Sequence, residues 1–128
     1  MHIIVLDNST TVQSKIEELL LKMDIDNLDI NLFENAEEAL DYSRSNDVKL
    51  IFSSIETDGM DGVSFIDNLL RVNPKYISSL FIVTSQKHTE SMEDIKELGV
   101  KRFIPKPINE NYFNHFVKAE IDKILKNI

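Results

Sequence analysis

The sequence has 128 residues, of which 42% are hydrophobic and 28% charged, so it is typical of one globular domain and unlike a disordered chain. The absence of cysteine excludes a disulfide framework, a thiolate metal site and thiol catalysis, and it fits the reducing cytoplasm, which is the expected location. A net charge of −8 disfavours nucleic acid and anionic membranes as partners, and no apolar run is long enough to predict a signal peptide or a membrane span.

The first part of the chain alternates short apolar runs with amphipathic segments. Residues 2–6 are apolar and rich in β-branched side chains, which predicts a buried strand. Apolar residues at helical spacing over 12–23 predict an amphipathic helix. Alternation over 28–32 predicts a strand with one wetter face, near an edge of the sheet. Asn35 is a predicted N-cap for a helix over 36–43.

The same alternation continues to the end of the chain. The turn-rich loop 56–62 separates a strand from a helix that Asn73-Pro74 ends, and Gly99 can end a later helix in the left-handed conformation. Asn109 can cap the last helix, whose aromatic and aliphatic stripe is interpreted as core for most of its length. The predicted elements are strands over 50–52, 80–83 and 100–104, and helices over 63–70, 92–98 and 112–125.

Five strand–helix units in succession predict a mostly parallel sheet with helices on both faces, within one domain over residues 1–128. In such sheets the carboxyl ends of the strands form the binding edge. Asp7, Ser54, Thr84 and Lys106 follow four of the predicted strands. A carboxylate, two hydroxyls and an ammonium are therefore expected to converge at this edge.

Several segments carry a resemblance to a known family: residues 3–9, the loop 54–62 with its last glycine eight positions after Ser54, Thr84, and Lys106-Pro107. Together they resemble the receiver domain of response regulators from bacterial two-component systems, over essentially the whole chain. The resemblance implies a flavodoxin-like (βα)5 fold with strand order 2-1-3-4-5 and a signalling role without enzymatic activity.

The resemblance also implies roles for particular residues. Asp7 corresponds to the second of two adjacent acids that hold Mg²⁺ in the family, and Glu56 stands where a backbone carbonyl completes the metal shell. Thr84 corresponds to the switch hydroxyl and Lys106 to the lysine, both of which bind phosphoryl oxygens. Phe103 corresponds to an aromatic residue whose rotamer changes with that hydroxyl. The family's Lys-Pro bond is often cis, and the sequence does not decide the isomer of this one.

Two positions depart from the family pattern. Leu6 stands where the first acid would be, and Ser54 stands at the place of the phosphorylated aspartate; sliding the match by one residue places Asn8 at the second acid without changing the number of carboxylates. At about 4 Å and an effective dielectric constant of about 20, each lost carboxylate removes about 8 kcal/mol of attraction for a divalent cation before desolvation. We therefore expect weak or absent Mg²⁺ binding, no other cofactor, and no ordinary phosphotransfer, because a serine hydroxyl needs a general base.

Other interpretations of these residues stay open at this point. Asp7 is either a remaining cation ligand or the charge partner of Lys106. The loop acids Glu56, Asp58 and Asp61 are either solvated or, with Asp7, a displaced metal site. The three histidines lie in unrelated segments and are not predicted to be ligands; they are His2, His88 and His115.

The resemblance implies a protein partner, either a histidine kinase or a signalling target, bound at the face of the fourth helix, the fifth strand and the last helix. We expect a monomer or weak dimer that signals without phosphorylation. The alternative is a Mg²⁺-dependent phosphoacceptor that uses Ser54 or a neighbouring acid. A more remote alternative is a flavodoxin-like cofactor-binding protein with a phosphate cradle at residues 8–11, although that loop lacks glycine.

Overall fold

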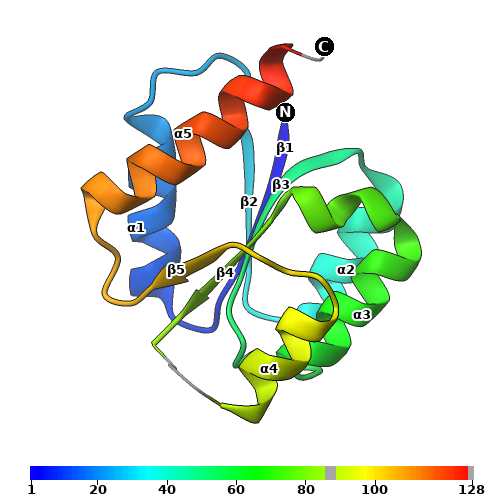
Figure 1. Ribbon diagram of the computed structural model, residues 1–128. Helices are drawn as coiled ribbons and strands as arrows, with labels where there is room; N and C mark the ends of the chain where they lie inside the picture. The colour runs from blue at the N-terminus through cyan, green and yellow to red at the C-terminus, as the bar shows by residue number, and fades with distance from the viewer. Residues whose placement is uncertain (86–88, 127–128) are drawn as a thin grey trace.

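The computed structural model describes residues 1–85 and 89–126. Its centre is a five-stranded parallel sheet in the order β2-β1-β3-β4-β5, as predicted (Figure 1). β1 and β3 are buried along most of their length, since both lie inside the sheet and are covered on both faces. The strands are β1 His2–Leu6, β2 Asp29–Phe33, β3 Val48–Ser53, β4 Leu80–Thr84 and β5 Phe103–Pro105.

Helices cover both faces of the sheet. α1 and α5 pack on one face, and α2, α3 and α4 pack on the other (Figure 1). Ser9, Asn35, Asp61 and Thr89 cap the first four helices, because the side chain of each accepts a backbone N–H of the first turn. The helices are α1 Thr10–Leu21, α2 Ala36–Ser45, α3 Gly62–Val72, α4 Glu90–Glu97 and α5 Glu110–Lys126, with a 3₁₀ helix η1 Pro74–Ser78 between α3 and β4.

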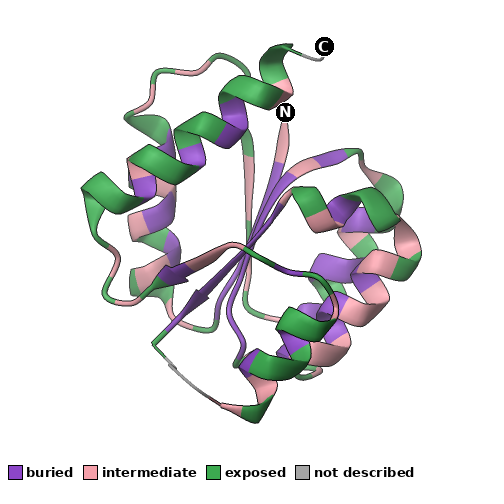
Figure 2. Cartoon of the chain, in the orientation of Figure 1, coloured by how far each residue is buried: buried purple, intermediate pink, exposed green. Residues whose placement is uncertain are grey.

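The sheet divides the core into two apolar layers. The layer under α1 and α5 contains Phe52, Phe81 and Phe113, whose rings stack with centroids 5.5 Å apart for Phe52–Phe81 and for Phe52–Phe113. The other layer lies under α2, α3 and α4 and includes Leu6 and Tyr76. Figure 2 shows the buried residues concentrated in the sheet and on the inner faces of the helices. The edge strands are therefore the places where side chains of the sheet meet solvent.

Some element boundaries differ from the predictions. The last strand begins at Phe103 and not at Val100. Val100 directly follows the Gly99 turn (φ +104°) and buries its side chain in the helix layer, and the chain pairs with β4 only from Phe103 onward. α1 ends before Met23. The chain after α3 forms η1, which was not predicted, with Pro74 at its first turn.

The edge strand β2 also differs in detail from its predicted alternation. Leu32 is 40% exposed although it belongs to the apolar set, since β2 has a neighbour on one side only. Asn31, expected on the wetter face, is half-buried and donates to the Tyr42 hydroxyl at 2.8 Å. Within the described ranges of the chain, no helix has the length and apolar character that crossing a membrane requires.

Candidate functional site

The candidate site lies at the carboxyl edge of the sheet, at the lower end of the strands in Figure 1. Asp7 directly follows β1, Ser54 follows β3, Thr84 ends β4, and Lys106 follows β5. Asp7, Ser54 and Thr84 are each less than 7% exposed, so the edge is a buried polar site rather than a solvated rim.

Asp7 and Lys106 form the central contact of this site. The Lys106 Nζ donates to Asp7 Oδ2 at 2.8 Å, with side chains 21% and 2% exposed, respectively. The other carboxylate oxygen, Oδ1, accepts the backbone N–H of Ser9 at 2.9 Å. Both carboxylate oxygens are thus engaged, and the pair is neutral as a unit. A buried pair of this kind is costly to separate, because either charge alone would lack compensation.

Gln13 holds the backbone of this corner, a role that the sequence interpretation missed. Its Nε2 donates to the carbonyl oxygens of Asp7 (2.7 Å) and Phe33 (3.0 Å), so it ties the end of β1 to the end of β2. Gln13 is 5% exposed. The sequence did carry a signal of its burial: Gln13 is a polar residue at helical spacing from Ile16 and Leu20, on the buried face of α1.

The Ser54 hydroxyl is engaged in its own turn. Ser54 Oγ accepts the backbone N–H of Glu56 at 3.3 Å, and the Ser54 N–H donates to the Leu6 carbonyl oxygen at 2.9 Å, as a continuation of the β1–β3 pairing. The Gly62 N–H then donates to the Ile55 carbonyl oxygen at 3.0 Å. A Cβ at Gly62 would lie 2.4 Å from that oxygen, so this close approach of two backbone segments requires glycine.

The loop after Ser54 is attached to the start of α2. The Ala36 N–H donates to the Asp58 carbonyl oxygen at 2.8 Å, and Gly59, at φ +93°, lies against the Asn35 side chain. Asp61 caps α3 through the N–H and hydroxyl of Ser64, both at 2.9 Å, and these hydrogen bonds lower the pKa of the Asp61 carboxyl. Asp58 and Asp61 are exposed and act in the loop through backbone and capping contacts.

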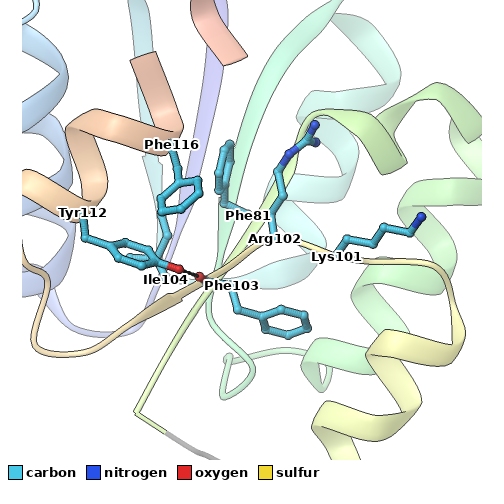
Figure 3. Close-up of a pocket in the computed structure, with 7 residues that line it drawn as sticks. All are labelled: Phe81, Lys101, Arg102, Phe103, Ile104, Tyr112 and Phe116. Carbon is cyan, nitrogen blue, oxygen red and sulfur yellow. Dashed lines mark hydrogen bonds between the residues drawn. The ribbon is translucent and has the colours of Figure 1, made fainter. Parts of the chain in front are cut away.

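Thr84 and Phe103 occupy the β4–β5 side of the site. The Thr84 carbonyl oxygen accepts the Lys106 N–H at 2.9 Å, and the Lys106-Pro107 peptide is cis. Phe103 is half-buried against the helix layer. The Lys96 Nζ lies 5.6 Å from the centroid of the Phe103 ring. The ring is thus packed on the α4 side of β5 (Figure 3).

The donors at this edge do not fit a magnesium ion. Asp7 supplies the only carboxylate among the four strand-end residues, and Lys106 already neutralises it. Glu56, the other residue that the resemblance suggested for the metal shell, is exposed. In residues 1–85 and 89–126, no three His, Asp or Glu side chains are grouped so that they could hold a metal ion. Mg²⁺ needs several hard oxygen ligands, and this set offers few.

The two histidines that the structure describes, His2 and His115, lie apart from the site. His2 Nδ1 contacts the Tyr42 hydroxyl at 2.7 Å and Asp29 Oδ2 at 3.0 Å, at the opposite end of β1. His115 is exposed beside Phe116 on α5. His88 lies outside the described residues.

The chain is similar to a known protein family. The family model of the response regulator receiver domain matches residues 3–118. A protein-glutamate methylesterase/protein-glutamine glutaminase of Methanosarcina mazei is 28% identical over 90 residues, which are 70% of this chain. The match takes in only 25% of that relative, so the chain spans about a quarter of its length.

Solved structures share the fold. A CheY-like receiver domain protein of Methanospirillum hungatei superposes with a TM-score of 0.82 at 18% identity, over 99% of this chain and 98% of that one. A two-component response regulator of Clostridium difficile gives 0.81 at 22% identity, over 97% and 98%. A chemotaxis response regulator of Vibrio cholerae gives 0.77 at 17% identity, over 93% and 97%. At these identities the likeness establishes the fold.

Proposed function

The chain belongs to the response regulator receiver domain family, and we propose that this receiver-domain signalling module works without an aspartyl phosphate, by contact with other proteins. One observation carries the proposal. Where the phosphorylated aspartate is expected, Ser54 stands with its hydroxyl in a backbone turn, and the remaining acid, Asp7, is paired with Lys106 at 2.8 Å. The alternative is a Mg²⁺-dependent phosphoacceptor, and the experiment below separates the two.

The charge at the site supports this proposal. With one carboxylate and one ammonium the site is formally neutral, whereas Mg²⁺ sites depend on carboxylate charge. A cation would also have to displace Lys106 from Asp7. We propose that magnesium binds weakly here or not at all.

The chemistry of Ser54 supports it as well. A hydroxyl becomes an effective nucleophile only when a nearby base takes its proton, and the base must lie within hydrogen-bond reach. The Asp7 oxygens already accept from Lys106 and Ser9, and the Ser54 oxygen accepts from Glu56. A phosphoserine would moreover be a stable ester, which is poorly suited to a reversible switch. No enzymatic activity is proposed for this chain.

We place the contact surface on α4, β5 and α5. This face carries exposed aromatic side chains of α5, Tyr112 and Phe116, next to the edge strand β5. The partner is a histidine kinase or a downstream signalling protein, and the chain itself is a monomer or weak dimer. Nucleic acid and membranes are not proposed as partners, since the net charge of −8 repels both.

The test is incubation of the chain with acetyl phosphate and millimolar Mg²⁺, followed by intact-mass measurement. We expect no stoichiometric gain of a phosphoryl group. Two variants serve as comparison: Ser54→Asp restores an acceptor, and Leu6→Asp/Ser54→Asp also restores the first of the two adjacent acids, which should raise Mg²⁺ affinity and labelling together. Because Leu6 is buried, circular dichroism must first show that the double variant is folded. Stoichiometric labelling of the unmodified chain would establish the phosphoacceptor alternative instead, and Ser54→Ala would then separate labelling of Ser54 from labelling of a neighbouring acid.

A further inference from the structure

β2 is one of the two outer strands of the sheet, and its outer edge is open. It pairs with β1 on one side, and no other strand in the part of the chain that the structure describes pairs with it. The Asp29 N–H donates to the Met1 carbonyl oxygen at 2.8 Å, so the backbone groups of Asp29 face β1. Successive residues of a strand point these groups to opposite sides, so the N–H and C=O groups of Ile30 and Leu32 face away from the sheet. They offer two donors and two acceptors to an added strand.

The side chains along this edge differ between the two faces of the sheet. Ile30 belongs to the apolar layer under α1 and α5, and Leu32 follows on the same face with 40% of its surface exposed. Asp29 and Asn31 lie on the opposite face, and Asp29 is exposed. An added strand would therefore place an apolar side chain against Leu32 on one face and a basic side chain against Asp29 on the other.

The charge around this edge is one-sided. Residues 23–43, which contain β2, its flanking loops and most of α2, hold seven of the 22 acids and none of the 14 Lys and Arg residues, so they carry a charge of −7 out of the total of −8. All seven acids are exposed. They are Asp24, Asp26, Asp29, Glu34, Glu37, Glu38 and Asp41. The net charge of the chain is thus concentrated beside one edge of its sheet.

Few of these charges are balanced within the chain. Asp41 forms an ion pair with Arg44 at 2.6 Å, and Asp29 contacts His2 at 3.0 Å. The other five acids form no ion pair with any residue that the structure describes. Opposite charges across an interface steer a partner toward it and select against wrong partners, so this edge favours a basic segment. A second copy is disfavoured, because pairing of β2 with β2 would bring two such groups of acids together.

We propose that the outer edge of β2 binds an extended segment of a partner protein, which adds to the sheet as one further strand. The backbone of that segment bonds to Ile30 and Leu32, and its apolar side chains cover Leu32. Its alternate side chains are basic and lie near Asp29 and the acids before and after β2. Because β2 and β5 are the two outer strands, this surface is separate from the face of α4, β5 and α5 and can be occupied at the same time.

The experiment titrates three blocked seven-residue peptides into the ¹⁵N-labelled chain at low ionic strength, where screening is weak. The first alternates Lys and Val and begins and ends with Lys, the second replaces Lys by Glu, and the third replaces Val by Gly. We expect the second and third to bind at least about tenfold more weakly than the first. Binding of the first should slow hydrogen exchange of the Ile30 and Leu32 amides about tenfold or more, and that of the Asn31 amide, which faces β1, by less.

Matched charge variants locate the binding. Asp26→Lys/Glu34→Lys and the control Glu97→Lys/Asp122→Lys each change the net charge from −8 to −4, since every acid-to-lysine substitution adds two charges. All four acids are exposed and form no ion pair within the described residues. Only the first pair of substitutions should weaken the Lys–Val peptide, by about tenfold.

A proline tests the role of the backbone. Leu32→Pro removes an N–H that faces away from the sheet, a position at which an edge strand tolerates proline. Leu32→Ala keeps this N–H and is the control for the lost side chain. We expect Leu32→Pro to weaken the Lys–Val peptide about tenfold and Leu32→Ala to weaken it by a smaller factor. If Leu32→Pro does not fold, the exchange of the Ile30 and Leu32 amides in the wild-type chain decides the question.

Four outcomes would overturn the proposal. They are equal binding of the Glu or Gly peptide, equal losses in the two charge variants, unchanged exchange of the Ile30 and Leu32 amides on binding, and binding of none of the peptides, which would leave the acids only the role of keeping β2 from pairing with itself. Slower exchange of the same amides at high protein concentration without peptide would identify a second copy as the occupant instead. None of these outcomes bears on the function proposed above, which is tested by acetyl phosphate labelling.

Discussion

Replacing Lys106 by methionine is expected to destabilise the domain more than replacing its partner Asp7 by asparagine. In Lys106→Met the Asp7 carboxylate, 2% exposed, keeps one donor among the residues that the structure describes, the Ser9 N–H at 2.9 Å. Removing one member of a buried ion pair costs about 3–5 kcal/mol, and we expect about 3 kcal/mol because Lys106 is 21% exposed and some water reaches the site.

The asparagine variant leaves a less severe defect. Its side-chain oxygen can still accept the Ser9 N–H, and the freed Lys106 ammonium can turn toward water. The expected loss is about 1.5 kcal/mol, which is the contribution of one hydrogen bond to a charged group. In the double variant no unpaired charge remains buried, so its loss should be smaller than the sum of the single losses by at least about 1 kcal/mol.

Urea unfolding at pH 7, followed by circular dichroism, measures all three free energies of unfolding. Unchanged m-values would show that the variants unfold from equally compact states. Equal losses for the two single variants, or additive losses in the double variant, would refute the view that Lys106 neutralises a buried Asp7 carboxylate.

Three further predictions concern residues that stabilise the fold. Gly62→Ala should cost about 2–3 kcal/mol in urea unfolding, because the new Cβ would lie 2.4 Å from the Ile55 carbonyl oxygen, and a loss below about 0.5 kcal/mol would contradict that contact. At pH 7 Asp61→Ala should cost about 1 kcal/mol and Asp61→Asn less, since asparagine also caps helices. The pKa of Asp61 is lowered from 3.8, so the contribution of its charge is present above pH 3.8 and is lost as the pH falls through the lower folded-state value. A pH-independent difference in stability between the wild-type chain and Asp61→Asn would contradict this. Tyr76→Phe should cost about 1 kcal/mol at pH 7, because the hydroxyl donates to the Ser43 carbonyl oxygen at 3.1 Å. Burial raises the pKa of Tyr76 above 10.0, so the wild-type chain should lose this advantage as the pH rises through that higher value, whereas Tyr76→Phe should show a smaller alkaline loss in urea unfolding.

The order of strands and helices, and the residues that end each strand, could be read from the sequence because they depend on local periodicity. The run over residues 2–6, the cap at Asn35 and the left-handed Gly99 all occur as predicted. The meeting of Asp7, Ser54, Thr84 and Lys106 at one edge also follows from the parallel topology, since the carboxyl ends of parallel strands lie together. The expected loss of two acids, at Leu6 and Ser54, rests on the resemblance to the receiver family and stays a prediction.

Only the tertiary structure decided which groups bond to one another. Asp7 and Lys106 are 99 residues apart in the chain, and their 2.8 Å contact depends on how β1 and β5 are placed in the sheet. Helical spacing could indicate that Gln13 is buried, but not that its side chain binds the Asp7 and Phe33 carbonyl oxygens, because these are backbone acceptors from two different strand ends.

The apolar stripe on the last helix is a second feature that the sequence alone could not predict in full. Phe113, Val117 and Ile121 are buried, while Tyr112 and Phe116 remain partly in water. Periodicity places all five residues on one broad side of α5, but the sheet covers only part of that side. The width of the neighbouring layer, which the sequence of the helix does not encode, determines which aromatic side chains stay exposed.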